Sequence, residues 1–499
     1  MELNEQVDRE LLRRFELEVK AKVPHWSGEA VSNPTPLVDL GRDVAECARE
    51  EYGMDLPDGG LTILGKMESV ILGGSIKTRP AVRIMEDAIA SGRLGRGRTV
   101  FEATSGNFGI ALGSFTRLGL DVVALVSRRL QQGVLDELRE RGVKTIDLDV
   151  DICPAPGMEV DGPTVTAQNV RESLGAIGLD PRRFDKVRGE AEGLLARQDA
   201  IGLAKLLAEA YGGFCPEQYD SELNVTAHES VTAPELDGQL RALGHSLADF
   251  DVVCTFGTGG TAGGIGRYVL KRYGRKGVHV VFPREGQDVA GIRSRAKAEG
   301  LRFYEPEGYA SQREVDFESA RPLMRFLAGR GHDIGESSAL ALYAALLMAG
   351  ERERLVVILP DGGEKYGDTL GDGTEVQPGQ VSSDPEGYDR VLWVHPVFSL
   401  RQEGVRVIAS ELGLEESRIG AVSPKEVERC LMTQRLGREL EGLAGRGGKV
   451  LLVCVAGGAS LRLARLLSSG GTEAKSLAGG AAGLARRADV QLADLLAVQ

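Results

Sequence analysis

The 499-residue sequence contains few cysteines, and none of them lie close together in the chain. The six cysteines form no CxxC pair; they are Cys47, Cys153, Cys215, Cys254, Cys430 and Cys454. Disulfide frameworks and zinc knots both need grouped cysteines, so this spacing predicts free thiols. The six histidines likewise form no pair at metal-ligand spacing, and we predict no metal site.

The sequence also has no long apolar run and no excess of basic residues. No stretch of about 18 apolar residues occurs, and the first segment, MELNEQVDRELLRRFELEVK, is acidic and amphipathic, unlike a signal peptide. We therefore expect a cytoplasmic protein without a membrane partner. The formal net charge of −13 disfavours binding to nucleic acid. A small molecule is the better expectation for a ligand.

From about Thr99 onward, β-branched runs alternate with helical patterns. The strand-like runs include TVFEA, DVVALV, DVVCTF, VHVVFP and LVVILP. This alternation is typical of βαβ units and predicts an α/β fold with largely parallel sheets. After Leu370 the chain becomes rich in Gly, Pro, Ser and Asp, which indicates a linker. We expect a first domain of residues 1–385 and a small C-terminal α/β domain of residues 386–499.

A glycine-rich loop follows the strand-like run DVVCTF. Its residues are Gly257, Thr258, Gly259, Gly260 and Thr261, and a helical pattern comes next. Backbone N–H groups of such a loop, with the helix dipole, can hold a phosphate. The same residues also fit a dinucleotide fingerprint with Glu285 beyond the next strand. A plain glycine turn that packs a helix on a strand is the third reading.

A second loop, in TVFEATSGNFGIAL, places Thr104, Ser105 and Asn107 between a strand and a helix. Hydroxyl, amide and helix-start N–H groups suit a carboxylate, although simple capping of the helix by Ser105 or Asn107 is the alternative. Lys77, in GGSIKTRPA, decides between these interpretations. A phosphate loop, a carboxylate loop and one lysine can hold a phosphorylated aldehyde and join it to an amino acid. The predicted cofactor is pyridoxal phosphate.

This arrangement resembles the β-replacement and β-elimination enzymes of pyridoxal phosphate fold type II, and among them the cysteine synthase and cystathionine β-synthase group. The resemblance runs in order from about Asn33 to Leu370, through NPTPLVDL, KMES, GGSIKTRPA, TVFEATSGNFGIAL, GGFCPEQYDSELNVTAHESVTAPEL, TFGTGGTAGGIGRY, GESSALAL and VVILPDGGEKYGDTL. It implies two doubly wound α/β subdomains with the cofactor between them, and a homodimer.

The resemblance also implies roles for individual residues. Lys77 would form the internal aldimine and later move the substrate α-proton. Asn107 would hydrogen-bond the 3′-oxygen of the pyridine ring. The cofactor phosphate would be held by Gly257, Thr258, Gly259, Gly260 and Thr261. The substrate carboxylate would be received by Thr104, Ser105 and Gln218.

The implied reaction is β-replacement on an activated serine, through an aminoacrylate, with a sulfur nucleophile as in a cysteine synthase. A β-eliminating lyase or desulfhydrase and a diaminopropionate-type synthase are alternatives within the same chemistry. Two other classes stay open. A nicotinamide-dependent oxidoreductase would explain the glycine loop alone, and an inactive regulatory homologue would retain the fold without the chemistry.

Three residues depart from the family pattern. Phe108 stands where threonine is usual, which would narrow the pocket or make it more apolar. Thr78 replaces an aspartate after the lysine. Gly362 stands where a serine or threonine hydroxyl commonly meets the pyridine nitrogen, so that a water, Asp361 or no donor would meet it here.

Two further segments have no settled role in the sequence. The segment around residues 153–200 is longer than the family needs, and it is interpreted as a lid, an oligomer contact or a surface insertion. Residues 449–484 read as strand, glycine loop, helix, strand and turn, and they resemble part of a rhodanese-like sulfurtransferase domain. That resemblance implies a persulfide on Cys454, although the usual loop arginine is missing. A buried structural cysteine is the alternative.

Overall fold

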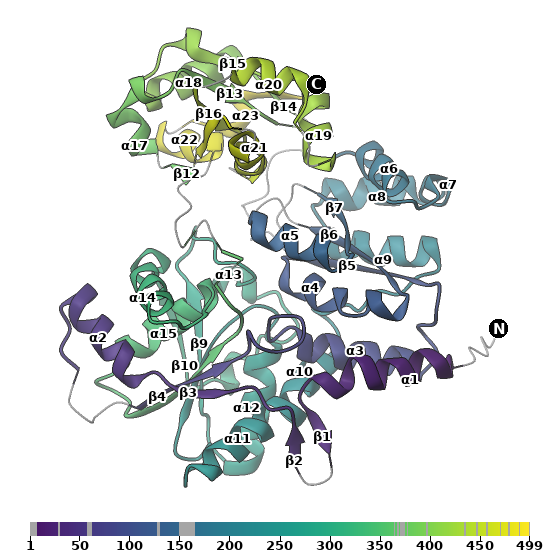
Figure 1. The fold of residues 1–499 in the computed structure, drawn as a ribbon, viewed down its shortest axis with the longest axis vertical. Helices are drawn as coiled ribbons and strands as arrows, with labels where there is room; N and C mark the ends of the chain where they lie inside the picture. Colours follow the sequence, from purple (N-terminus) through teal and green to yellow (C-terminus); the bar gives the residue numbers. More distant parts are fainter. Residues whose placement is uncertain are drawn as a thin grey trace.

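Three sheets with parallel strands organise the chain, each covered by helices (Figure 1). The fold comes from a computed structural model. It describes residues 7–27, 30–56, 62–126, 130–148, 165–363, 365–366, 369, 375–376, 378–395, 398–433, 436–445, 448–455, 458–469, 471–477, 480–488 and 490–498. The expected α/β class is confirmed.

The small subdomain is built on a parallel sheet with the order β5–β6–β7. Its strands are β5 (Thr99–Thr104), β6 (Asp121–Val126) and β7 (Lys144–Asp147). Alternate residues of β6 face opposite sides of the sheet, as the period of two requires. Val122 and Ala124 pack toward α4 (Asn107–Gly113) and α5 (Gln132–Glu140). Val123 and Leu125 pack into a second core on the other face.

The long insertion supplies that second core. Its helices are α6 (Ala167–Ala176), α7 (Pro181–Asp185) and α8 (Arg188–Ala196), followed by α9 (Ala200–Tyr211). Val170, Leu174 and Phe184 are fully buried there against the strand residues Phe101 and Val123. The described part of the insertion is therefore a helical layer of the small subdomain. Residues 149–164 lie outside the described chain.

The large subdomain is built on six strands in the order β10–β9–β8–β11–β4–β3. They are β10 (Ser311–Val315), β9 (Val278–Pro283), β8 (Asp251–Thr255), β11 (Arg354–Leu359), β4 (Thr62–Met67) and β3 (Leu37–Asp39). All neighbours are parallel except β3 with β4. The central strands are apolar and buried because helices cover both faces.

The other elements of these two subdomains are mostly helical. They are α1 (Arg9–Glu18), η1 (Lys20–Lys22), β1 (His25–Ser27), β2 (Ala30–Ser32), α2 (Gly41–Tyr52), α3 (Thr78–Ala90), η2 (Thr116–Leu118), α10 (Glu222–Ala227), the π-helical turn η3 (His228–Thr232), α11 (Ala233–Ala242), α12 (Gly260–Tyr273), α13 (Arg295–Ala298), η4 (Pro306–Gly308), α14 (Phe317–Gly329) and α15 (Glu336–Leu347). Strands β1 and β2 form an antiparallel hairpin.

The C-terminal unit has a parallel sheet with the order β12–β17–β16–β13–β15, drawn in green to yellow in Figure 1. Its strands are β12 (Glu375–Val376), β13 (Arg390–Trp393), β15 (Ile419–Ala421), β16 (Lys449–Val453) and β17 (Glu473–Leu477), with a separate antiparallel pair β14 (Phe398–Leu400) and β18 (Leu496–Val498). Its helices are α17 (Pro378–Ser383), η5 (Pro385–Gly387), α18 (Gln402–Leu412), η6 (Glu416–Arg418), α19 (Pro424–Thr433), α20 (Arg438–Ala444), α21 (Gly458–Ser469), α22 (Gly480–Ala488) and α23 (Leu492–Leu495).

Strand β12 lies before residue 385, where the sequence predicts the end of the first domain. Glu375 pairs with Ser476 and Val376 pairs with Leu477, so β12 belongs to the C-terminal sheet. We therefore propose a boundary between Tyr366 and Glu375, and the division into independent domains stays a prediction. The expected strand, loop, helix and strand around Cys454 are β16, α21 and β17, but α22 stands where a turn was expected. The rhodanese resemblance also stays a prediction.

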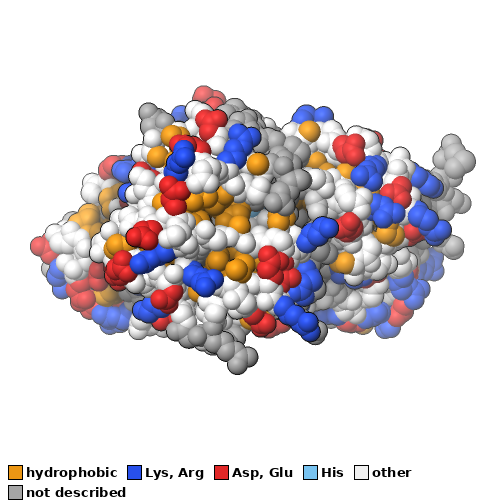
Figure 2. Space-filling model, turned by 90° about the horizontal axis from the view of Figure 1, so that it is seen from above, with side chains coloured by type: hydrophobic (Ala, Val, Ile, Leu, Met, Phe, Trp, Pro, Cys, Tyr) orange, Lys and Arg blue, Asp and Glu red, His pale blue; other side chains and the backbone are white. Residues whose placement is uncertain are grey.

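Charged side chains of both signs are interspersed on the face drawn in Figure 2. No helix in the described part of the chain has both the length and the apolar character needed to cross a membrane. The described cysteines, all except Cys153, are free thiols. Within the same residues, no group of three or more metal-ligating side chains is assembled.

A buried network of four charges ties α3 to β4 and α11. Arg79 donates to Glu68 Oε2 at 2.7 Å and to Glu235 Oε2 at 2.7 Å. Lys66 Nζ lies 2.5 Å from Glu235 Oε1. All four side chains are almost completely buried, and their charges cancel. Such a network holds its elements in one geometry because no member can lose its partner without leaving a bare buried charge.

We expect Arg79→Leu to lower the free energy of unfolding by about 3–5 kcal/mol, because two buried carboxylates lose their partner. Arg83→Leu is the matched control, since Arg83 lies one turn later on α3 and is exposed. It should cost less than about 1 kcal/mol. Urea unfolding measures both changes, and equal losses in the two variants would contradict the assigned role of the network.

Candidate active site

Lys77 is held at the start of α3 by contacts on both sides. Before it, Gly73 and Gly74 adopt φ values of 95° and 68°, a turn that glycine makes without strain. The Ile76 N–H donates to the Pro360 carbonyl at 2.8 Å, which fastens the loop to the end of β11. Thr78, the residue that replaces aspartate, donates its hydroxyl to the Leu72 carbonyl at 2.5 Å. Thr78 therefore stabilises the turn and does not line the cavity.

The Lys77 amine lies in a desolvated cavity between the two subdomains. Its Nζ is 3.5 Å from Thr258 Oγ1. Burial, helped by the nearby charge of Arg293, lowers the pKa of Lys77 to about 8. About one tenth of the amine is therefore neutral at pH 7, far more than for an ordinary lysine, and a nucleophilic lysine needs this neutral form.

The glycine loop forms the wall facing Lys77. Helix α12 begins at Gly260, and Gly259 before it has a φ of 89°. A Cβ at Gly257 would lie 2.8 Å from the Gly291 carbonyl oxygen, and one at Gly259 would lie 2.6 Å from the Phe303 carbonyl oxygen. Only glycine fits at these two positions without moving the neighbouring backbone. This geometry fits a phosphate, as the sequence predicts.

The second loop contributes Ser105, Asn107 and Phe108 to the same cavity, which also includes Gln218 and Tyr219. Asn107 Oδ1 is buried and has no hydrogen-bond partner, so it is open to a ligand. Thr104 does not line the cavity. Its Oγ1 accepts from the N–H groups of Gly106 and Gly109 at 3.1 and 3.2 Å. The Thr104 hydroxyl thus caps α4, a role for which the sequence suggests Ser105 or Asn107 instead.

Two polar residues that sequence reasoning missed hold Gln218 in place. Asn224 Nδ2 donates to the Gln218 carbonyl at 2.7 Å and to Thr258 Oγ1 at 2.9 Å, and so joins the two loops. Glu102 is buried on β5 and accepts from the backbone N–H groups of Glu217 and Gln218 at 2.9 and 3.3 Å. Burial raises the pKa of Glu102 to about 7, against the pull of those hydrogen bonds. In the sequence, Asn224 and Glu102 are each a polar residue inside a helix or an apolar run. This pattern is too common to identify them as part of a site.

Asp361 lies beside Asn107 at the end of β11. Its Oδ2 accepts from Asn107 Nδ2 at 2.7 Å and also from the Tyr366 hydroxyl, and Lys365 Nζ is 3.5 Å away. Gly362, where the family usually has a hydroxyl, does not line the cavity and lies against Asp333. Asp361 does not line the cavity itself and reaches it only through Asn107, so the partner of a ring nitrogen stays a prediction.

Glu336 connects the two subdomains beside the cavity. Its carboxylate accepts from Gln131 Nε2 at 2.7 Å, in the small subdomain, and from the Ala290 N–H at 2.9 Å, in a loop that lines the cavity. The Thr369 hydroxyl also donates to it. Burial raises the pKa of Glu336. Nothing in the motif GESSALAL distinguishes Glu336 from its neighbours.

A desolvated lysine faces a glycine-lined anion loop and a carboxylate loop between two α/β subdomains, which defines the class of pyridoxal phosphate enzymes of fold type II. A family model described as "Pyridoxal-phosphate dependent enzyme" matches residues 32–361. The chain belongs to this family and is a pyridoxal phosphate-dependent enzyme. Family membership favours this cofactor over a nicotinamide. The match ends before the C-terminal unit.

Relatives and solved structures agree with the family. A cysteine synthase of Staphylococcus aureus is 28% identical over 345 residues, covering 66% of this chain and 92% of the relative. Cysteine synthase 1 of Emericella nidulans is 30% identical over 366 residues, covering 68% of this chain and 83% of that protein. A crystal structure of O-ureido-L-serine synthase is 26% identical with a TM-score of 0.50, and it covers 68% of this chain and 92% of that one.

We expect Lys77 in the cofactor-free chain to react with an amine-directed acylating reagent at a rate that rises with pH around a midpoint near 8. Ordinary lysines rise toward about 10.4, because only the neutral amine reacts. Peptide mass spectrometry after short labelling at pH 6–11 measures both in one sample. A Lys77 midpoint that coincides with the other lysines would show that the amine is not desolvated.

Because of Glu102, we predict that the free energy of unfolding falls as pH rises. Its raised pKa means that the stabilising protonated form is complete below about 4.5 and is lost as pH rises through about 7. At about 1.36 kcal/mol per pKa unit, the free energy of unfolding should fall by about 3 kcal/mol over this interval. Glu102→Gln should remove the Glu102 part of this slope and leave the part that Glu336 contributes, whereas the exposed Glu140→Gln should keep the whole slope. Urea unfolding at several pH values measures the slope, which would persist unchanged in Glu102→Gln if other groups caused it.

Proposed function

We propose that the enzyme catalyses β-replacement on an activated serine or a related β-substituted amino acid, with a sulfur nucleophile, as a cysteine synthase does. One observation carries the proposal. A single cavity brings together Lys77, the Gly257–Thr261 loop, Ser105, Asn107 and Gln218. These are the groups needed to hold a phosphate, a pyridine ring and an amino-acid carboxylate beside one amine.

Pyridoxal phosphate, when bound, supplies an electron sink that stabilises negative charge at the substrate Cα. In the proposal, the N–H groups of the Gly257–Thr261 loop hold the phosphate, and Asn107 orients the ring. Ser105 and Gln218 receive the substrate carboxylate, and backbone groups of the Thr104 loop assist. Lys77 takes the proton from Cα and returns it, a task suited to an amine whose pKa lies near 8.

The relatives support the choice of reaction. Two of them are named cysteine synthases, and the solved structure at 26% identity is named O-ureido-L-serine synthase. Phe108 gives the cavity an apolar wall, which suits a small, weakly hydrated nucleophile such as hydrosulfide. β-Elimination and replacement by an amine are the other outcomes of the same chemistry. A cytoplasmic location and pairing of two chains stay predictions.

The test is turnover of O-acetylserine with and without sulfide by the purified, cofactor-loaded enzyme. We expect cysteine to form with sulfide and little pyruvate to form without it. Lys77→Ala should lose the visible absorption of the bound cofactor and slow turnover by about 10²–10⁴-fold, because the Cα proton then has no acceptor. Lys276→Ala, at an exposed lysine after α12, is the matched control and should retain both.

Three results would contradict the proposal in different ways. Pyruvate without cysteine would assign the enzyme to elimination. Product only when an amine replaces sulfide would assign it to diaminopropionate-type synthesis. A folded chain that binds pyridoxal phosphate through Lys77 yet turns over none of these substrates would be a regulatory homologue.

A further inference from the structure

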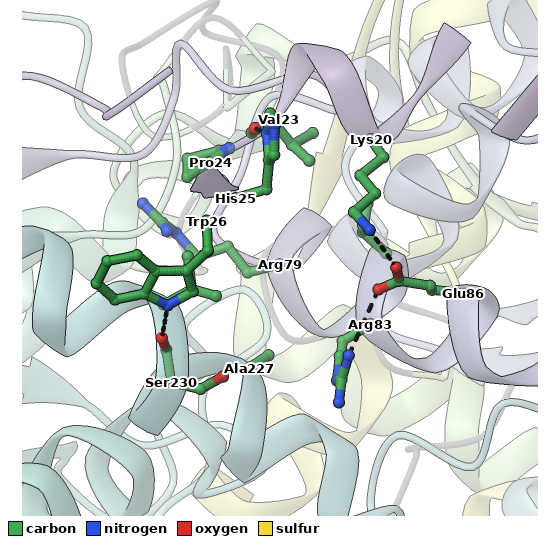
Figure 3. Close-up of a pocket in the computed structure, with 12 residues that line it drawn as sticks. Lys20, Val23, Pro24, His25, Trp26, Arg79, Arg83, Glu86, Ala227 and Ser230 are labelled. Carbon is green, nitrogen blue, oxygen red and sulfur yellow. Dashed lines mark hydrogen bonds and ion pairs between the residues drawn. The ribbon is translucent and has the colours of Figure 1, made fainter. Parts of the chain in front are cut away.

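A second cavity lies outside the site just described, on the far side of the first turns of α3. It measures about 320 Å³, within the range of small-molecule sites. Three parts of the chain that are distant in sequence form its walls (Figure 3). They are the segment from η1 to β1, helix α3, and the junction of α10 with the π-helical turn η3. None of its lining residues contributes to the Lys77 cavity.

An indole ring is fixed at the rim of this outer pocket. Trp26 is 47% exposed to solvent, so its ring is accessible to a ligand. Its Nε1 donates to the Ser230 carbonyl at 2.6 Å, so the ring cannot swing freely (Figure 3). An oriented, exposed indole face is a stacking surface for a flat ring.

The charged groups of the outer pocket leave one positive charge in excess. Lys20 Nζ lies 2.5 Å from Glu86 Oε1, and Arg83 Nη1 lies 3.5 Å from Glu86 Oε2. Two cations therefore share one carboxylate (Figure 3). Arg79 also lines the pocket, but the buried network of Lys66, Glu68 and Glu235 balances its charge. The excess charge belongs to Lys20 and Arg83, which favours an anion.

The pocket is next to the elements that position the active site. Arg79 follows Lys77 by two residues on α3, and Ser230 lies in the same π-helical turn as His228. His228 Nε2 in turn lies 3.4 Å from Thr261 Oγ1, in the glycine loop. Single π-helical turns inside helices are frequently found at functional sites. An occupant of the outer pocket would thus contact both elements without entering the Lys77 cavity.

We propose that the outer pocket binds a small anion that carries a flat heteroaromatic ring, of about the size of a nucleoside monophosphate. The ring stacks on Trp26, and the anionic group pairs with Lys20 and Arg83. The ligand needs both the ring and the anionic group, because one excess charge or one indole ring alone offers too little interaction. The site lies apart from the proposed catalytic residues and does not depend on the reaction assigned to them.

Tryptophan fluorescence of the cofactor-loaded enzyme tests this site directly. The chain has two tryptophans, and the other, Trp393, is buried in the C-terminal unit. Titration with adenosine 5′-monophosphate should quench Trp26 in a saturable way. Adenosine and inorganic phosphate should each bind at least about tenfold more weakly, since each lacks one half of the recognition. The cofactor occupies the phosphate loop throughout, so its visible absorption should not change.

Charge variants make the test specific. Lys20→Ala and Arg83→Ala should each weaken binding about tenfold, because a charge-assisted hydrogen bond is lost. Glu86→Gln should tighten it severalfold by removing the competing carboxylate. Lys22→Ala is the matched control, since Lys22 lies on the same turn η1 but outside the pocket, and it should bind as the unchanged enzyme does.

Four results would overturn the proposal. They are the absence of both saturable quenching and binding heat, equal affinity in Lys20→Ala, Arg83→Ala and Lys22→Ala, equal binding of adenosine, and displacement of the cofactor by the nucleotide. Circular dichroism confirms that each variant is folded. Isothermal titration calorimetry repeats the measurement without relying on Trp26. It detects binding even if the fluorescence does not change.

Discussion

The geometry of the active site depends on a buried balance of charge beside it. Arg79 and Lys66 lie among Glu68 and Glu235 with almost no exposure to water, and Arg79 is two residues from Lys77. Because each carboxylate needs its cation, the start of α3 cannot shift relative to β4 and α11 without a large loss of stability. The rigid start of α3 therefore holds Lys77 in the desolvated cavity. On a flexible loop, the lysine could move out into water.

Local patterns in the sequence predicted the parts of the site that act through backbone and turn geometry. The glycines of the Gly257–Thr261 loop and the turn before Lys77 require special conformations, and these are visible as motifs. Groups that work through distant partners had no such signal. Glu102 meets Gln218, and Asn224 meets Thr258, only after the chain has folded. The same holds for the outer pocket, which joins Trp26 to Ser230.

The fold was predictable where strands are buried on both faces and poorly predictable at its borders. Runs such as DVVCTF and LVVILP are apolar because helices cover both sides of β8 and β11, and they were recognised as strands. Strand β12 is two residues long, and its pairing with β17 has no counterpart in local composition. The composition of the loop-rich segment places the expected boundary at residue 385, about ten residues after β12, and the division into domains stays a prediction.

The strand order of the large sheet also constrains how the chain is made. Strand β4 lies between β3 and β11, and Thr62 pairs with Arg354, about 290 residues later. During synthesis at about 5–20 residues per second, β4 waits on the order of 15–60 s for its neighbour to leave the ribosome. The sheet β5–β6–β7 is complete well before then. The small subdomain can form first. The cavity around Lys77 is completed only when β11 and the residues after it have been made, which is nearly three quarters of the chain.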